Sequence, residues 1–478
     1  MNQKICINAD LAPVYYNPIS EHDDIAKRQE LGSLGLKEFI VVVNIDVQSY
    51  GIMNKFIQKK FQINPKLPQW RTIAIAALKS KVTLLKSLLS IGTAKKVKNS
   101  LDNTEYAVIG NFFSFTGIFD PITVKILQSI SGIRFIEEVM YATNDGNTLE
   151  LLSEPSSVNQ INKRSENSSE TFTTYEKRAD GIFFQRYAPW ALSRISSSSL
   201  PSPIYPYGNG YTFKNGGDGV VVYVIDSGIN IDHQEFQGRA SFGPNIAFNS
   251  DGKLTEDNYD YMGHGTAVAS MVGGVTFGAA KKAKIISYKI AAYGLGVAVN
   301  TMIQAINDIN NIISTANDGR IASLAVCSYI TTTVSPAWDL AVTQFTEMGY
   351  IYVASAGNNR ADACNKSPIS SLNSISVGST DSSDGYQSTT NFGRCVDIYA
   401  PGVNVYTADY KTNYKTIMGT GTSYSAPLVA GICALILGDQ PTLNLTQIKS
   451  VLLQISAKNV LKSTLENSVN VLAQVPLA

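Results

Sequence analysis

Residues 220–229 read VVVYVIDSGI and indicate the architecture of the C-terminal part of the chain. An apolar run of this length is typical of a strand that is buried on both faces, as in a parallel sheet. Further apolar runs, AKIISYKI at 283–290 and YIYVASA at 350–356, alternate with helical patterns such as TMIQAINDINNII at 301–313. This alternation predicts an α/β fold, a doubly wound and mostly parallel sheet with helices on both faces.

The N-terminal part has a different pattern. Residues 37–140 show strand-like and helical stretches in βαβ-αβ order. One predicted helix has Asp120 as its N-cap and Pro121 at its first position, where proline is tolerated. We therefore expect a small α+β domain with an antiparallel sheet, preceded by a polar leader at 1–36.

The two predicted domains are separated by a segment of different composition. Residues 141–186 are rich in Ser, Asn, Glu and Thr and contain few apolar side chains to offset chain entropy. This segment is predicted to be a linker, and residues 187–478 are predicted to form the large α/β domain.

The overall composition excludes several functional classes. With 39 basic and 38 acidic residues, the chain has no general attraction to nucleic acids or anionic membranes. No window approaches the roughly 18 uninterrupted apolar residues of a membrane span, and the first twenty residues lack the apolar core of a signal peptide. The five cysteines include no close-spaced pair typical of zinc sites, and Cys433 is expected to be a small buried hydrophobe.

Three polar residues stand where an open α/β sheet gathers its functional groups. Asp226 ends the strand at 220–225, and His264, one of three histidines, lies between two glycines in YDYMGHGTAVASMVGG (259–274). Ser423 begins an apolar helix after a Gly-Thr-Gly-Thr turn. Singly, these residues are also explained as a turn cap, a packed or surface histidine and a helix cap. Together they supply an orienting acid, a general base and a nucleophile.

The motifs around these residues resemble those of subtilisin-like serine proteases, in the proteinase K and cerevisin branch. VIDSG at 224–228, GHGTAVA at 263–269 and GTSYSAP at 421–427 stand in the family's chain order. The resemblance implies that Asp226 orients His264 and that Ser423 is the nucleophile. The stretch YIYVASAGNNRADACNKSP also resembles the family and puts Asn358 at its oxyanion-hole position.

A second resemblance concerns the N-terminal domain. Residues 106–138 resemble the final half of the inhibitor-type propeptide of subtilisin-like zymogens, which implies that 37–140 assist folding and block the cleft until they are cut away. YAPWALSRIS at 187–196 resembles the start of the mature enzyme and implies a maturation cut in the preceding linker. Of two dibasic pairs there, Lys163-Arg164 and Lys177-Arg178, the second is the candidate cut site.

The resemblance also assigns the substrate cleft. One edge is expected to pair with extended peptide through main-chain hydrogen bonds, and a second segment is expected to form the opposite wall of the primary pocket. The residues matched to these positions are Ser328, Tyr329, Ile330, Ser355, Ala356 and Gly357. Ile330 replaces a glycine of the family and is expected to narrow the first or the fourth pocket, and Tyr424 replaces a methionine and is expected to crowd the nucleophile. Because no acidic residue stands at the matched positions, we expect a preference for apolar or medium-sized residues.

Two further features follow from the family match. Cys364 and Cys395 lie in loops that pack near each other in the family, so that they form either a disulfide or two buried free thiols. Asp397 matches a calcium ligand of the family, which implies a structural calcium site, whereas catalysis needs no metal.

The leading hypothesis is a monomeric serine endopeptidase made as a zymogen, acting on polypeptides and inhibited by its own propeptide. By family resemblance it is secreted or enters the secretory or vacuolar pathway. A second hypothesis is a catalytically silent homologue with a binding or regulatory role, in which Tyr424 and Ile330 obstruct the cleft. A third, an intracellular peptidase, is suggested by the missing signal peptide and conflicts with the propeptide and the expected disulfide.

Overall fold

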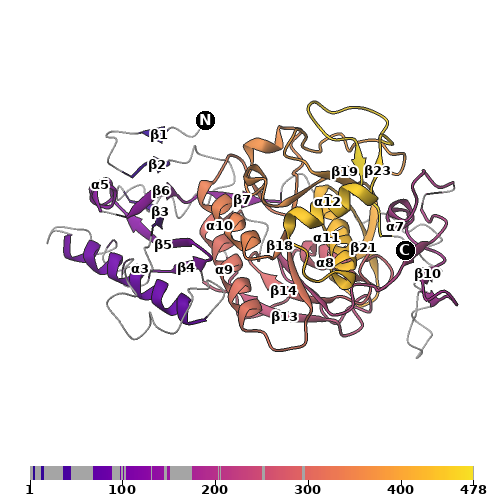
Figure 1. Cartoon of the computed structure of the whole chain (residues 1–478), viewed down its shortest axis with the longest axis horizontal. Coiled ribbons are helices and arrows are strands. Elements are labelled where there is room, and N and C mark those ends of the chain that lie inside the picture. Colours follow the sequence, from indigo (N-terminus) through magenta and orange to yellow (C-terminus); the bar gives the residue numbers. More distant parts are fainter. Residues whose placement is uncertain are drawn as a thin grey trace. The chain divides into compact units, whose positions relative to one another are not determined.

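The computed structural model of the chain describes residues 4–5, 12–15, 36–44, 68–88, 97, 101, 104–130, 132–144, 148–150, 175–202, 204, 206–249, 253–292 and 296–476 (Figure 1). Cys6, His22 and the Lys163-Arg164 pair lie outside these residues. The chain divides into two compact units. Unit 1 comprises Met1–Ala142, Leu295–Ala316 and Thr331–Met348, and unit 2 comprises Thr143–Gly294, Asn317–Ile330 and Gly349–Ala478.

Unit 2 is built on a sheet of nine described strands. In spatial order these are β13 (Ala240–Asn245), β14 (Lys284–Lys289), β12 (Val220–Asp226), β16 (Ala322–Cys327), β18 (Ile351–Ser355), β19 (Ile375–Thr380), β20 (Ile398–Pro401), β24 (Val471–Leu472) and β23 (Ala457–Lys458). Neighbours are parallel from β13 to β24, and β23 is antiparallel to β24. β12 is buried along its whole length, as its unbroken apolar run predicts.

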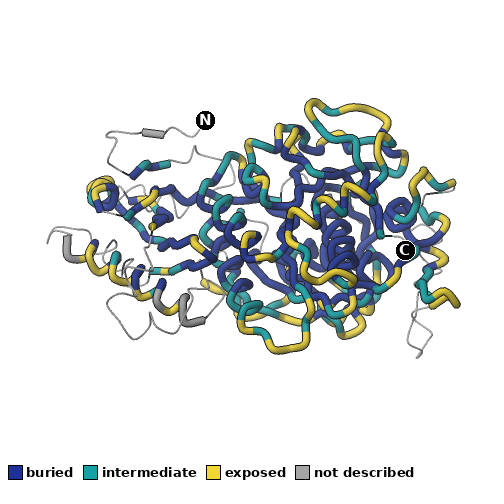
Figure 2. The backbone as a smooth tube through the Cα atoms, viewed as in Figure 1, coloured by how far each residue is buried: buried dark blue, intermediate teal, exposed yellow. Residues whose placement is uncertain are grey.

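The central helix of unit 2 is α11 (Thr422–Asp439), which packs against α8 (His264–Gly273) and against strands β12, β16, β18 and β19. Figure 2 shows α11 as buried, and the four strands are buried along nearly their whole length. By length and composition α11 would suit a membrane span, but 89% of it is buried inside the protein. The unit also contains α7 (Trp190–Ile195), α12 (Leu445–Ile455), and the 3-10 turns η1 (Ala363–Asn365) and η2 (Ile369–Ser371).

Parts of the predicted linker are ordered as strands. β9 (Glu176–Lys177) and β10 (Phe183–Gln185) pair with each other, and β10 pairs with β11 (Tyr211–Phe213). β8 (Thr148–Glu150) pairs with β22 (Thr416–Thr420), which in turn pairs with β21 (Val405–Ala408). These parts of the predicted linker thus form main-chain hydrogen bonds to β11 and β22, which compensate for their polar composition.

Unit 1 contains a sheet of six described strands. In spatial order these are β1 (Lys4–Ile5), β2 (Val14–Tyr15), β6 (Ile133–Glu138), β3 (Lys37–Val43), β5 (Phe112–Phe119) and β4 (Tyr106–Ile109). Its other elements are α3 (Pro68–Leu88), α5 (Pro121–Ser129), α9 (Val299–Thr315), α10 (Pro336–Glu347), β15 (Val297–Ala298) and most of β7 (Tyr141–Thr143), while β17 (Ile330–Thr331) lies at the division between the units.

The local predictions for the N-terminal domain are confirmed. β3 is antiparallel to both of its neighbours, β5 and β6. The Asp120 carboxylate caps α5 by accepting the backbone N–H of Thr123 at 2.6 Å, with Pro121 in the first turn. The predicted fold class, a mostly parallel sheet with helices preceded by a small α+β region, is therefore the observed one.

Candidate active site

The carboxyl end of β12 and the N-terminus of α8 bring Asp226 and His264 together. Nδ1 of His264 donates to the Asp226 carboxylate, 2.8 Å from Oδ1 and 3.0 Å from Oδ2. Gly263 precedes the helix with a φ of 79°, a left-handed conformation that favours glycine. Both side chains are buried, so their interaction is little screened by water.

Burial and the neighbouring carboxylates oppose each other at the imidazole. Burial lowers the pKa of His264, but the charge and hydrogen bond of Asp226 and the charge of Asp260 raise it by more, so that it lies above the ordinary 6.5. The protonated imidazole is therefore stabilised, as the positively charged intermediate of a proton transfer requires.

Ser423 is the second residue of α11 and is fully buried. Its Oγ donates to the backbone oxygen of Ser328 at 3.4 Å, and the Ser328 hydroxyl donates to the backbone oxygen of Ser423 at 3.3 Å. Among the described residues no hydrogen-bond partner reaches Nε2 of His264, which is buried. The bond from Ser423 to His264 is thus not formed here; such bonds are often absent until substrate binds.

Two tyrosines flank the imidazole. The ring centroids of Tyr329 and Tyr424 lie 6.3 and 6.0 Å from that of His264. A methyl group on Gly419 would lie 2.4 Å from Cζ of Tyr424, so this ring lies directly over the glycine of β22. Tyr424 therefore packs beside the candidate base rather than at the surface.

Asp260 is a buried carboxylate that sequence reasoning missed. It accepts hydrogen bonds from the Ser227 hydroxyl at 2.8 Å, from the backbone N–H of Gly263 at 2.8 Å, and from the Thr266 backbone and hydroxyl at 2.9 and 2.7 Å. Burial raises the pKa of this carboxyl, and the hydrogen bonds offset only part of that rise. Asp260 thus connects Ser227, the residue after Asp226, to the residues around His264 by hydrogen bonds. The feature of the sequence that could have indicated this role is its position four residues before the histidine.

Asn358 follows β18 and is held by the segment that carries Ser423. Its Oδ1 accepts the backbone N–H of Thr422 at 2.9 Å, and the Gly357 N–H donates to the Thr422 hydroxyl at 3.1 Å. These two bonds fix the orientation of the Asn358 amide relative to the start of α11. They bring the fourth predicted residue to the same part of unit 2 as Ser423.

The residues predicted to line the cleft are all buried, and their two walls meet. The six residues are Ser328, Tyr329, Ile330, Ser355, Ala356 and Gly357. A methyl group on Gly357 would lie only 2.2 Å from Cδ1 of Ile330. The isoleucine side chain therefore lies against the glycine of the opposite wall and fills space between the two segments.

His233, in the segment that follows β12, is buried. Its Nε2 lies 3.0 Å from the backbone oxygen of Lys415, and its Nδ1 accepts the Glu235 N–H at 3.2 Å. Burial lowers its pKa. The polar sequence around His233 gives no sign of its bond to Lys415, which lies in a distant segment.

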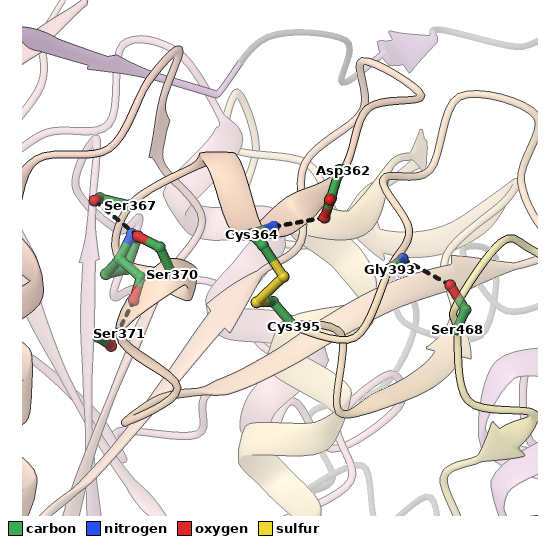
Figure 3. Close-up of a disulfide and its surroundings, with 9 residues drawn as sticks. Asp362, Cys364, Ser367, Ser370, Ser371, Gly393, Cys395 and Ser468 are labelled. Carbon is green, nitrogen blue, oxygen red and sulfur yellow. Dashed lines mark hydrogen bonds between the residues drawn. A yellow bond between two sulfur atoms is a disulfide. The ribbon is translucent and has the colours of Figure 1, made fainter. Parts of the chain in front are cut away.

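The cysteines divide into a bonded pair and free thiols. Cys364 and Cys395 form a disulfide, which joins η1 to the loop before β20 (Figure 3). Of the other cysteines within the described ranges, Cys327 and Cys433 are free and buried, as predicted for Cys433.

The residues around Asp397 do not fit a calcium ion. The Lys449 ammonium donates to Asp397 Oδ1 at 2.8 Å and to the Leu372 carbonyl at 3.1 Å, and Asp397 Oδ2 accepts the Ser376 N–H at 2.9 Å. Carboxylate and carbonyl oxygens are the ligands calcium prefers, and here an internal cation already holds them. No other group of three or more His, Cys, Asp or Glu side chains in the described ranges is arranged to hold a metal.

Known proteins match this chain in sequence and fold. The family model "Subtilase family" matches residues 217–470. "Alkaline protease 1" of Aspergillus clavatus is 33% identical over 370 residues, 76% of this chain and 78% of that protein. "Subtilase-type proteinase psp3" of Schizosaccharomyces pombe is 36% identical over 296 residues, 60% of this chain and 62% of its own length.

A solved structure agrees with these sequence matches. The crystal structure of a cold adapted subtilisin-like serine proteinase superimposes with a TM-score of 0.53 and 34% identity, covering 61% of this chain and all of its own. The family match at residues 217–470 contains Asp226, His264 and Ser423. The chain belongs to the Subtilase family of serine proteases.

Proposed function

We propose that this chain is a serine endopeptidase that cleaves polypeptides through an acyl-enzyme on Ser423. The observation that carries the proposal is the buried contact between Asp226 and His264. With Ser423 at the start of α11 and Asn358 fixed by Thr422, it provides the groups that acyl transfer needs. This set, with the family's relatives, argues against a catalytically silent homologue.

The mechanism uses protein groups alone. Ser423 Oγ attacks the substrate carbonyl carbon while His264 Nε2 takes its proton, and Asp226 holds Nδ1–H and stabilises the imidazolium. The Asn358 amide donates to the oxyanion of the tetrahedral intermediate. His264 then returns the proton to the leaving amine. In the second half of the reaction, water attacks the acyl carbon while His264 takes its proton, and His264 gives that proton to Ser423 Oγ as the acyl bond breaks.

We further propose that the enzyme is made as a zymogen, with residues 37–140 as its propeptide. Three observations support this. β8 pairs with β22 immediately before Ser423, through Thr420 and Thr148 and the two pairs that precede them. Ser423 and His264 are almost fully buried in the uncut chain. The Glu137 carboxylate accepts the Ser335 hydroxyl and, at 2.8 Å, the Ala337 N–H at the start of α10.

In this proposal β8 lies along β22, beside the start of α11, in the manner of a substrate. β7 pairs with β15 at residues 141 and 142, and β8 follows along β22. Main-chain pairing of this kind is how peptides add to a sheet edge. Cleavage of the linker removes the covering strands. Lys177-Arg178, both exposed, remains the candidate site of a maturation cut.

The decisive experiment is active-site labelling with a fluorophosphonate. We expect the processed chain to be labelled at Ser423 and Ser423→Ala to lose both labelling and peptide hydrolysis. Because a silent homologue would keep its fold and fail to label, absence of labelling in processed, folded protein refutes the proposal. Ser425→Ala, which removes a neighbouring hydroxyl bonded to Ala400 and Pro401, is the matched control.

The Cys364–Cys395 disulfide supports a place in the secretory or vacuolar pathway, because such bonds persist in oxidising compartments. Immunolocalisation of the full-length chain in its own cells, with reduced and non-reduced samples compared on gels, tests this. A cytoplasmic chain with reduced thiols would contradict it.

A further inference from the structure

The side chain of Asn391 is buried against the loop that carries Asn358. It has no exposed surface. Its Nδ2 donates to the Ala356 carbonyl at 2.8 Å, and its Oδ1 accepts the backbone N–H groups of Asn359 and Ala361 at 3.1 and 2.9 Å. Its own N–H donates to the Gly357 carbonyl at 2.8 Å.

These contacts enclose Asn358. The Gly357 carbonyl belongs to the peptide group before Asn358, and the Asn359 N–H belongs to the peptide group after it. Asn391 therefore holds both peptide planes that set the direction of the Asn358 side chain. The Gly357 backbone depends on the same packing, since it has a φ of 95° and a methyl group there would lie 2.5 Å from Asn391 Nδ2.

The two segments that meet at this contact are also joined just beyond it. Asp362 forms a bridge with Phe392, and the Ala363 N–H donates to the Phe392 carbonyl at 2.8 Å. The Cys364–Cys395 disulfide joins the same two segments a few residues further along, as Figure 3 shows. Asn391 thus lies on a firmly anchored segment, and its side-chain hydrogen bonds restrict the movement of the backbone next to Asn358.

We propose that Asn391 is a positioning residue of the oxyanion hole, which fixes the Asn358 amide in the direction where negative charge develops. The inference rests on the proposed function. A preorganised donor stabilises the transition state because it does not have to reorient during the reaction. A loss of alignment at such a group can cost about 10²-fold in rate.

The test is a double-mutant cycle with Asn391→Ala, Asn358→Ala and the double variant in the processed enzyme. We expect Asn391→Ala to lower kcat by about 10²-fold with little change in KM, and to weaken a peptide aldehyde inhibitor, whose hemiacetal oxygen occupies the hole, by a similar factor. In the Asn358→Ala background the same substitution should have less than about a threefold effect, since two residues that act as a unit are not additive.

Asn470→Ala is the matched control, because this side chain also bridges a loop, with bonds of 3.0 Å to both the N–H and the carbonyl of Leu461. It should leave kcat unchanged. If Asn391→Ala does not fold, Asn391→Asp, which keeps the acceptor and loses the donor to Ala356, takes its place in the cycle. Equal losses in both backgrounds, or an unchanged kcat in the folded variant, overturn the inference. A wild-type chain that does not label with fluorophosphonate instead refutes the proposed function.

Discussion

Replacing Ile330 should open the primary pocket of the protease. Cδ1 of Ile330 lies against Gly357, so the side chain occupies space between the two segments that we predict to be the walls of the cleft. Ile330→Gly removes four carbons, which leaves room for a side chain of the size of leucine on the substrate. At about 0.8 kcal/mol per buried methylene, the gain for the larger residue is about 3 kcal/mol. That corresponds to about 10²-fold in the ratio of kcat/KM values.

The assay compares peptide substrates that differ only in alanine, leucine or phenylalanine before the cut bond. Ile330→Val removes a single methylene and should shift the leucine-to-alanine ratio of kcat/KM by about fourfold, between the wild type and Ile330→Gly. Fluorophosphonate titration of Ser423 corrects for any unfolded fraction. If Ile330→Gly is folded and active but the ratio changes by less than about threefold, Ile330 does not limit the pocket.

Three further predictions concern charged groups. The raised pKa of His264 places the acid limb of the pH profile of kcat/KM above pH 6.5, because only the neutral imidazole accepts a proton. An acid limb below pH 6.5 would contradict the raised pKa of His264. Burial raises the pKa of Glu137 from 4.5 to about 7, so the contribution of this group to stability is complete below pH 4.5 and is lost as pH rises through 7. Urea denaturation of the Ser423→Ala chain at different pH values should show this loss of stability. In the Glu137→Gln variant this pH dependence should be absent. Calcium or a chelator should leave the Tm of the Ser423→Ala chain unchanged. Adding Lys449→Ala, which removes the ammonium, should lower the Tm and make it rise with calcium. A calcium-dependent rise in Tm with Lys449 in place, abolished by Asp397→Asn, would show that the site takes the metal.

The local sequence was enough to predict the buried strand β12 and the start of α5. The apolar run before Asp226 predicted a buried strand, and the Asp120-Pro121 pair predicted the start of α5, because burial on both faces and helix capping are properties of a few consecutive residues. The grouping of Asp226, His264 and Ser423 required the topological rule that strand ends share an edge, together with the family resemblance.

What the sequence did not reveal depends on long-range partners. The bond from Ser227 to Asp260, the burial of His233 and the pairing of β8 with β22 are all set by segments distant in the chain. Lys449 is separated from Asp397 by 52 residues, so nothing near Asp397 indicated that a lysine would take the expected cation's place. Hydrogen-bond partners of this kind follow from the fold and are invisible to local pattern.

The helix that presents Ser423 is also the helix around which the core of unit 2 packs. With Ser423 as the proposed nucleophile, a chain that has not completed this core has no assembled active site and is expected to be inactive. For the same reason, many inactivating substitutions will act by disturbing the packing of α11, far from any reacting atom. The measured activity of a variant will then depend on its folding yield as much as on its chemistry.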